Sequence, residues 1–341
     1  MIGYDIGIGT RLCERDFALV ASSLEAGLKV VQMPFRDVAQ SARLSEERVL
    51  EISRGMLDSG YIRRFGAFFD FRRVGLKGYL FGVELPCDKK PEVVSFVGNM
   101  GCVTHSYARR HSLGLWFTAI LDGDDAASAI GGSLRERGLK FVALGVRERI
   151  KLRPSFAPVE AGASCFDAGD DAGDRVSLSA GQMNIARALQ NNFDISGRPY
   201  ALIADLMGLG ESGERIILDE AKRLFQQGIL RRIGASLNHN RAGWMANSLT
   251  AWDMSRLSEA EVSLAARVAV TDRPWASHCY LRYVVDGNLP YTWPYNLYIM
   301  IHALSDDELD ERERTLFCDL QPRNFLSMRT EAEYKKISFK I

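Results

Sequence analysis

The sequence GYIRRFGA at residues 60–67 recurs as GILRRIGA at residues 228–235. A second pair of matching strings follows in the same order, THSYAR at residues 104–109 and SHCYLR at residues 277–282. Two matched blocks in one order indicate an internal duplication, which has to be recognised before any single element is interpreted. The chain is therefore expected to consist of two similar halves with the same succession of helices and strands.

Each copy of the first repeated block, at residues 60–67 and 228–235, follows a stretch with helical periodicity. Apolar residues recur at helical spacing within residues 45–58 and again within residues 211–226. A glycine, a common helix stop, ends each stretch at position 60 or 228. Two shorter helical segments come before each of these helices. A short strand and an alternating segment come after it and predict a two-stranded wing, followed by further strands and helices.

These patterns predict an α+β fold in which each half is a winged helix-turn-helix followed by a ferredoxin-like α/β sandwich. Between the halves, residues 154–174 are rich in Ala, Gly, Asp and Pro and have no apolar periodicity, so a flexible acidic linker is expected there. The predicted divisions are residues 11–75 and 177–243 for the helix-turn-helix units, 76–153 and 244–330 for the sandwiches, and 154–176 for the linker.

The composition excludes several classes of protein. The 341 residues include 43 basic and 43 acidic side chains, and 47% of them are hydrophobic, as in a globular chain with buried cores. A net charge of zero argues against a dedicated nucleic-acid binder. The sequence has no apolar run long enough for a membrane span and no signal-peptide pattern near Met1, so a cytoplasmic protein is expected. The six cysteines are scattered without a zinc-binding spacing.

The third helix of each half would be the DNA-reading helix of a helix-turn-helix protein. Residues 45–58 carry four acidic side chains against two arginines, and residues 211–226 carry four acidic side chains against three basic ones. Phosphate groups repel a net acidic surface, since DNA binding depends on cationic contacts to the backbone. The fold of a DNA-binding protein is therefore expected here without its DNA-binding surface.

The two matching strings after the wings share a His-x-Tyr-x-Arg pattern. Its members are His105, Tyr107 and Arg109 in the first half and His278, Tyr280 and Arg282 in the second. A period of two places the three side chains of each set on one face of a strand. A face with a titratable ring, a hydroxyl and a fixed cation is suited to a ligand rich in carboxylates. A purely structural role for these residues is the alternative.

Several strings together resemble a known family. They are RRIGA at residues 231–235, LNH at 237–239, SHCY at 277–280 and WPYNLY at 293–298, with RRFGA and HSY as first-half counterparts. In these strings the chain resembles the siroheme decarboxylases, which are related to the Lrp/AsnC regulators. The presence of two such halves in one chain is similar to the fused NirD–NirL form, and the paired AhbA/AhbB subunits are also similar.

The resemblance implies a carboxy-lyase whose substrate is siroheme. The implied reaction removes the acetate carboxyls at C12 and C18 and gives 12,18-didecarboxysiroheme, for heme d1 or an alternative heme route. It implies no organic cofactor, because the substrate itself carries the iron. The two halves are expected to pair as an intramolecular pseudo-dimer. A homodimer and companion decarboxylase subunits stay open, whereas DNA and membranes are not expected as partners.

The resemblance also suggests roles for individual residues. His105 and His278 are expected to be the proton donors, since decarboxylation leaves an electron pair that has to be protonated. Arginine side chains are expected to hold the carboxylates that stay, and aromatic groups to surround the one that leaves. The expected binding residues are Arg63, Arg231, Tyr107, Arg109, Tyr280, Arg282, Trp293 and Tyr295. His239 is interpreted as an axial iron ligand, an acid or a surface residue, and no metal held by the protein alone is expected.

Two other functions fit a protein of this type. The first is an Lrp/AsnC-type transcriptional regulator that senses heme or another tetrapyrrole, which would bind duplex DNA in a salt-dependent manner. The second is a regulator of amino-acid metabolism, which would have no need of the repeated His-x-Tyr-x-Arg faces. Mass spectrometry after anaerobic incubation with siroheme distinguishes the enzyme from both.

Overall fold

The computed structural model describes residues 14–152, 175–191, 193–238 and 241–341. The helices are α1 (Glu14–Ala26), α2 (Pro34–Ala42), α3 (Glu46–Asp58), α4 (Lys90–Asn99), α5 (Asp124–Glu136), α6 (Ala180–Asn191), α7 (Pro199–Leu206), α8 (Gly213–Gln226), α9 (Glu259–Val270) and α10 (Asp306–Leu320). The strands are β1 (Ile62–Phe69), β2 (Lys77–Val83), β3 (Val103–Arg109), β4 (Leu115–Leu121), β5 (Phe141–Leu152), β6 (Leu230–Leu237), β7 (Ala246–Asp253), β8 (Ala276–Gly287), β9 (Leu297–Ala303) and β10 (Asn324–Lys336). The mixed content is that of the predicted α+β class, and nearly all of the predicted linker lies outside the described residues.

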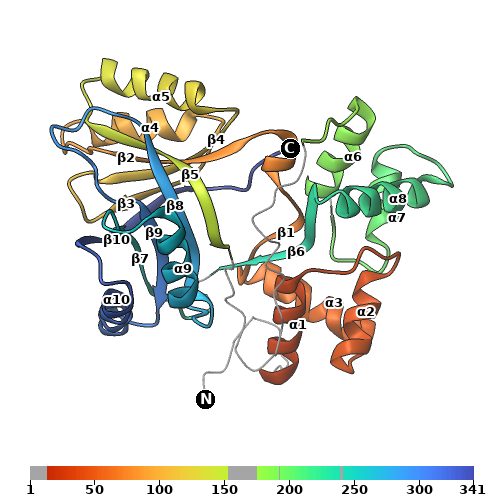
Figure 1. Cartoon of the computed structure of the whole chain (residues 1–341). Coiled ribbons are helices and arrows are strands. Elements are labelled where there is room, and N and C mark those ends of the chain that lie inside the picture. Colours follow the sequence, from red (N-terminus) through yellow and green to blue (C-terminus); the bar gives the residue numbers. More distant parts are fainter. Residues whose placement is uncertain (1–13, 153–174, 192, 239–240) are drawn as a thin grey trace.

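Eight of these strands form a closed antiparallel barrel in the order β10-β3-β4-β2-β5-β8-β9-β7. Each half contributes four strands in the chain order β-α-β-β-α-β. The two four-stranded sheets are joined where β5 pairs with β8 and where β10 pairs with β3. In Figure 1 the barrel lies on the left, and helices α4, α5, α9 and α10 cover its outer face. The two halves therefore pair with each other within one chain.

The barrel strands bury side chains on both faces. On the outer face, Phe81 and Phe117 stack with their ring centroids 4.7 Å apart beneath α4 and α5. On the inner face a separate cluster includes Leu80, Trp116 and Leu144 together with residues of the second half. Strands that are buried on both faces read as long apolar runs with few polar interruptions. The polar residues on their inner face therefore mark the place where the barrel is not filled by its own core.

The remaining helices form two three-helix units, α1–α3 and α6–α8, that share one hydrophobic core. The expected two-stranded wing within each half is wrong, because β1 pairs with β6 of the other half in an antiparallel two-stranded sheet. The reason is that the next strand of each half, β2 or β7, belongs to the barrel, so β1 and β6 have only each other as partners. Figure 1 shows β1 and β6 between the helical units and the barrel.

The repeated glycines have a packing role in this paired sheet. Gly66 in β1 lies opposite Gly234 in β6. Gly66 has a φ of 146°, and a Cβ there would lie 2.9 Å from the carbonyl oxygen of Gln190 in α6. A Cβ at Gly234 would collide with the carbonyl oxygen of Leu24 in α1. Each half thus packs a helix against the strand of the other half, which is why the GA sequence occurs twice.

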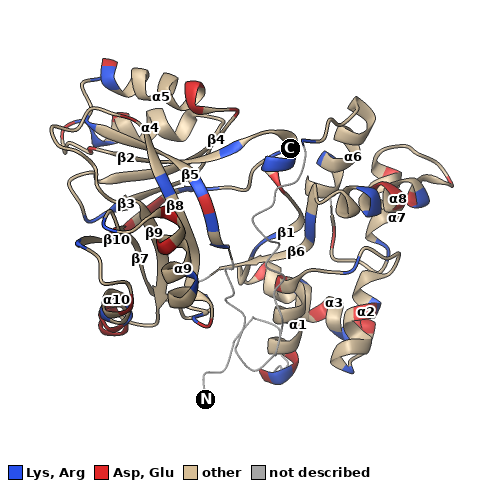
Figure 2. Ribbon diagram, viewed as in Figure 1, with Lys and Arg blue, Asp and Glu red and all other residues tan. Residues whose placement is uncertain are grey.

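The surfaces of α3 and α8 carry side chains of both signs (Figure 2). Arg48 pairs with Glu51 at 2.6 Å on α3, and Arg223 pairs with Glu220 on α8. Both helices thus carry the mixed charge that the sequence gives them, and the prediction against DNA binding stays a prediction. No helix in the described ranges is long and apolar enough to cross a membrane.

Candidate functional site

A cavity of about 970 Å³ lies between the inner face of the barrel and the paired β1–β6 sheet, and it is lined from both halves of the chain. This volume is near the upper end of the range for small-molecule sites. Both copies of the His-x-Tyr-x-Arg pattern line it, His105, Tyr107 and Arg109 from β3 and His278, Tyr280 and Arg282 from β8. The prediction that the three side chains of each strand share a face is confirmed. The two faces, which are far apart in the sequence, form one site.

Positive charge dominates the cavity wall. Among the described lining residues, eight are basic and three are acidic. The basic ones are Arg72, Lys77, Arg109, Arg147, Arg149, Arg231, Arg282 and Lys336. Each acidic side chain has a cation beside it, at 2.7 Å for Asp70, 2.6 Å for Glu333 and 3.6 Å for Glu331. The excess of cations favours a ligand with several carboxylate groups.

Arg109 and Arg282 are held at the cavity wall by backbone oxygens. Nη1 of Arg109 donates to the Met328 carbonyl oxygen at 3.0 Å, and Nη1 of Arg282 donates to the Leu144 carbonyl oxygen at 3.4 Å. Each guanidinium lies over the tyrosine two residues earlier, at 5.2 Å from Tyr107 and 4.8 Å from Tyr280. The buried Nε atoms of both arginines have no hydrogen-bond partner in the described part of the chain. These N–H groups are available to a bound anion.

Each of the two histidines is held by the side-chain hydroxyl of the residue before it. Nδ1 of His105 lies 2.9 Å from Oγ1 of Thr104, and Nδ1 of His278 lies 2.7 Å from Oγ of Ser277. Burial is the main cause that lowers the pKa of His105 to about 4 and that of His278 to about 3, and neighbouring cations lower both pKa values further. Both rings are therefore neutral at pH 7 in the protein by itself.

These depressed pKa values predict that the protein loses stability in mild acid. The unfolded chain takes up protons below about pH 6.5, whereas His105 and His278 stay neutral in the folded protein down to about pH 4. At pH 5.5 each ring is expected to cost about 1.4 kcal/mol of unfolding free energy relative to pH 7.5. Urea unfolding of the wild type and of the His105→Gln/His278→Gln variant across this range measures it. Equal pH slopes for the two proteins would contradict the prediction.

Three of the predicted binding residues do not line the cavity. Arg63 lies beside it, where its Nη1 donates to Oε1 of Glu333 at 2.6 Å. Trp293 and Tyr295 lie one layer behind the wall, and Nε1 of Trp293 donates to the hydroxyl of Tyr298 at 2.6 Å. Tyr298 itself lines the cavity. Glu333 binds Arg63 and Tyr298 binds Trp293, whereas direct contacts of the three residues with a ligand are not tested and stay predictions.

His239 lies outside the described residues, so the interpretations of this residue are not tested. Of the wing arginines, Arg231 does line the cavity, as predicted. The roles of all the predicted site residues stay predictions.

Residues missed in the sequence lie at one end of the cavity. Arg149 of β5 is opposite Tyr280, and its pKa is lowered by burial and by the nearby cations Arg72 and Arg231. The equivalent position in β10 is occupied by Glu333, opposite Tyr107. The only available signal for Arg149 was the run of charged residues at positions 147–151 of β5, which Ile150 alone interrupts. The His278 end of the cavity is thus rich in cations, whereas the His105 end has a carboxylate at the matching place.

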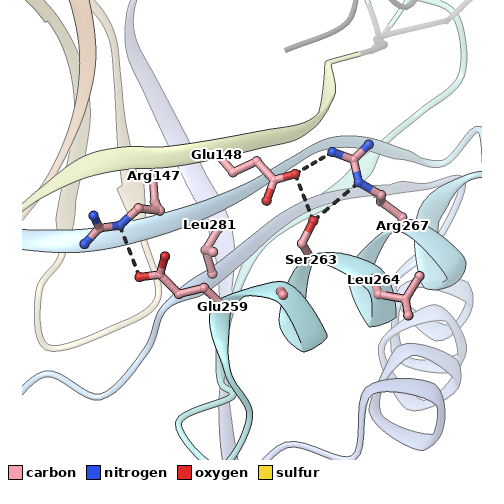
Figure 3. A pocket seen from close by; sticks show the side chains of 8 residues that line it. Arg147, Glu148, Glu259, Ser263, Leu264, Arg267 and Leu281 are labelled. Carbon is pink, nitrogen blue, oxygen red and sulfur yellow. Dashed lines mark hydrogen bonds and ion pairs between the residues drawn. The ribbon is translucent and has the colours of Figure 1, made fainter. Parts of the chain in front are cut away.

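A second pocket of about 550 Å³ lies on the outer face of the barrel between β5 and α9. Its charged residues are paired with one another, as Figure 3 shows. Arg147 lies 3.2 Å from Glu259, and Glu148 pairs with Arg267 and accepts a hydrogen bond of 2.8 Å from Ser263. A pocket with balanced and satisfied charges selects no ligand by charge. The cavity at the inner face of the barrel is therefore the candidate site.

A family model and curated relatives of known function both match this chain. The model of the AsnC-like ligand binding domain matches residues 241–335. The siroheme decarboxylase of Hydrogenobacter thermophilus is 24% identical over 330 residues, which are 95% of this chain and 94% of the relative. The siroheme decarboxylase beta subunit of Oleidesulfovibrio alaskensis is 33% identical over 154 residues, which are 45% of this chain and 90% of the relative.

A solved structure shares the whole fold. The crystal structure of the siroheme decarboxylase NirDL has a TM-score of 0.70 to this chain at 21% identity, covering 95% of this chain and 94% of the other. The same protein has been crystallised in complex with an iron-uroporphyrin III analogue. The architecture with two halves in one chain is thus found in a second protein.

Proposed function

The chain belongs to the siroheme decarboxylase family, and from this premise we propose that it converts siroheme to 12,18-didecarboxysiroheme. The proposed reaction is R–CH2–COO⁻ plus one proton giving R–CH3 and CO2, carried out at two acetate side chains without oxidation or reduction. The chemistry is that of a carbon–carbon lyase in which the protein supplies a binding site and protons. No organic cofactor has a part in it.

The observation that supports the proposal most directly is the charge of the cavity. Siroheme is a tetrapyrrole with eight carboxylate side chains, and the cavity wall has eight basic residues against three acidic ones. All three acidic residues are paired, and of the basic ones Arg72, Arg147 and Lys336 also have carboxylate partners. Buried arginines hold carboxylates in a fixed geometry, which decides which acetate lies beside a proton donor. Arg109, Arg149, Arg231 and Arg282 are the proposed carboxylate-binding residues.

His105 and His278 are the proposed proton donors. The carboxylates of a bound substrate favour the charged form of a nearby imidazole, so binding is expected to raise the pKa of both rings from their low values. Tyr107 and Tyr280 lie beside the histidines and the arginines on the same faces, where their hydroxyls can orient the carboxylates.

We propose that one chain contains the complete site. Relatives that are named as single subunits align with about half of this chain, for example the beta subunit with 45% of it. Here both halves contribute residues to one cavity. The intramolecular pairing of β5 with β8 and of β10 with β3 then replaces the association of two subunits.

Anaerobic incubation of the purified chain with siroheme tests the proposal. Mass spectrometry is expected to show a product that has lost two CO2, with a singly decarboxylated species as the intermediate. A boiled sample and a sample with iron-uroporphyrin as a competitor are the controls. An unchanged mass at complete binding of siroheme would contradict the proposal and favour the tetrapyrrole-sensing alternative.

A further inference from the structure

A chain of hydrogen bonds leads from His278 into the wall of the barrel. Nδ1 of His278 lies 2.7 Å from Oγ of Ser277, and the same oxygen lies 3.0 Å from Nε2 of His302. Oγ of Ser277 is also 3.5 Å from the carbonyl oxygen of Met300. The Ser277 hydroxyl has one proton, and in the arrangement that a relay requires it donates this proton to Nδ1 of His278 while Oγ accepts from Nε2 of His302. Nε2 of His278 is then the nitrogen that is left for a ligand.

The other end of the cavity lacks the third member of this chain. Oγ1 of Thr104 lies 2.9 Å from Nδ1 of His105 and 3.4 Å from the carbonyl oxygen of Thr118. The strand registers place Ile120 where His302 stands in the second half. An isoleucine can neither donate nor accept a proton. The two histidines of the repeated pattern are therefore equivalent in position but not in their connection to a proton source.

We propose that Ser277 and His302 are positioning residues that form a proton relay to His278. The relay returns a proton to His278 after each transfer, so proton delivery continues at the His278 end of the cavity. The inference rests on the proposed function and adds to it the residues that reload the donor. His302 itself lines the cavity, which gives the relay a route to solvent between turnovers.

The relay accounts for every proton in one step. The C–C bond to the leaving carboxylate breaks, and the methylene carbon keeps its electron pair. The Nε2 proton of neutral His278 forms the new C–H bond, while Nδ1 takes the proton of the Ser277 hydroxyl. Ser277 in turn takes the Nε2 proton of His302, which enters as an imidazolium ion and leaves neutral. His278 changes only its tautomer, so its depressed pKa is no obstacle to this step.

Two variants interrupt the relay while every lysine and arginine of the cavity wall stays in place. Ser277→Ala removes the bridging hydroxyl, and His302→Ile installs the residue that the first half tolerates at the matching place, Ile120. Both are expected to lower kcat by about 10- to 100-fold, while KM and the Kd for iron-uroporphyrin change less than about 2-fold. Ser277→Thr, which copies Thr104, is expected to restore most of the lost kcat. In mixtures of H2O and D2O the wild-type rate should show more than one proton in flight, and the Ser277→Ala rate only one.

A second measurement is independent of turnover. In protein labelled with ¹⁵N-histidine, the NMR shifts of His278, assigned with a His278→Gln sample, are expected to show a proton on Nε2 and a hydrogen-bonded Nδ1. Ser277→Ala should shift the Nδ1 signal. An unchanged kcat in Ser277→Ala, a loss of kcat matched by weaker binding, or a His278 protonated at Nδ1 would each overturn the relay. An inactive wild type with the expected His278 tautomer would instead count against the proposed decarboxylation.

Discussion

Replacing His278 by alanine is expected to lower the rate of decarboxylation by about 10²- to 10⁴-fold, the usual contribution of a positioned general acid. The ring lines the cavity and is the member of the histidine pair that is linked to Ser277 and His302. Binding should persist, because the arginines that face the carboxylates are untouched. Single-turnover assays with mass spectrometry give the rate, and the visible absorption of bound siroheme gives the occupancy.

His105→Ala is the companion variant, and it is also expected to reduce turnover. The ratio of singly to doubly decarboxylated product then tells which carboxylate each histidine serves. His111→Ala is the control, since His111 does not line the cavity and its Nδ1 accepts a hydrogen bond from the Leu113 backbone. Wild-type turnover by both His105→Ala and His278→Ala would refute the assignment of these residues as proton donors.

The second large effect is expected from reversing one charge of the wall. Arg149→Glu should raise the Kd for iron-uroporphyrin by at least about 100-fold. A hydrogen bond to a charged group contributes about 1.5–3 kcal/mol, and the new carboxylate adds repulsion. Arg149 lies opposite Tyr280 in the same cationic cluster as Arg72 and Arg231. Absorption titrations at low and high salt measure the change and its electrostatic part.

Glu333→Gln is the matched variant at the equivalent position of the other half. It removes a carboxylate from the wall and frees Arg63 from its ion pair, so it is expected to strengthen binding. Opposite signs for the two substitutions would show that the charge of the cavity selects the ligand. Equal Kd values for Arg149→Glu and the wild type would disprove the proposed contact at the His278 end.

The sequence by itself determined the duplication, the α+β class and which side chains share a face on each of the two His-x-Tyr-x-Arg strands. Period-two spacing is a local property of a strand, so the common face of His105, Tyr107 and Arg109 follows from the sequence alone. The same reasoning placed Tyr280 and Arg282 beside His278. The net acidic charge of the third helix of each half could also be predicted from the sequence, because it depends only on the residues of that helix.

Only the tertiary structure decided which of these faces meet. Closure of the eight strands into one barrel joins both His-x-Tyr-x-Arg faces in one cavity, and it recruits Arg149 from a strand that carried no recognised motif. The same pairing brings β1 to β6 instead of forming a wing in each half, and it puts Tyr298 in front of Trp293. Long-range strand pairing depends on edges that a local pattern does not specify.

The protonation of the site was also beyond the sequence. A histidine in a sequence has its ordinary pKa, and only burial among cations lowers the pKa values of His105 and His278 so far that both rings stay neutral in mild acid. The connection of His278 to His302 likewise depends on the register of β8 against β9. Residue types and their local spacing are thus fixed by the chain, whereas desolvation and hydrogen-bond partners arise from neighbours that only the folded barrel brings together.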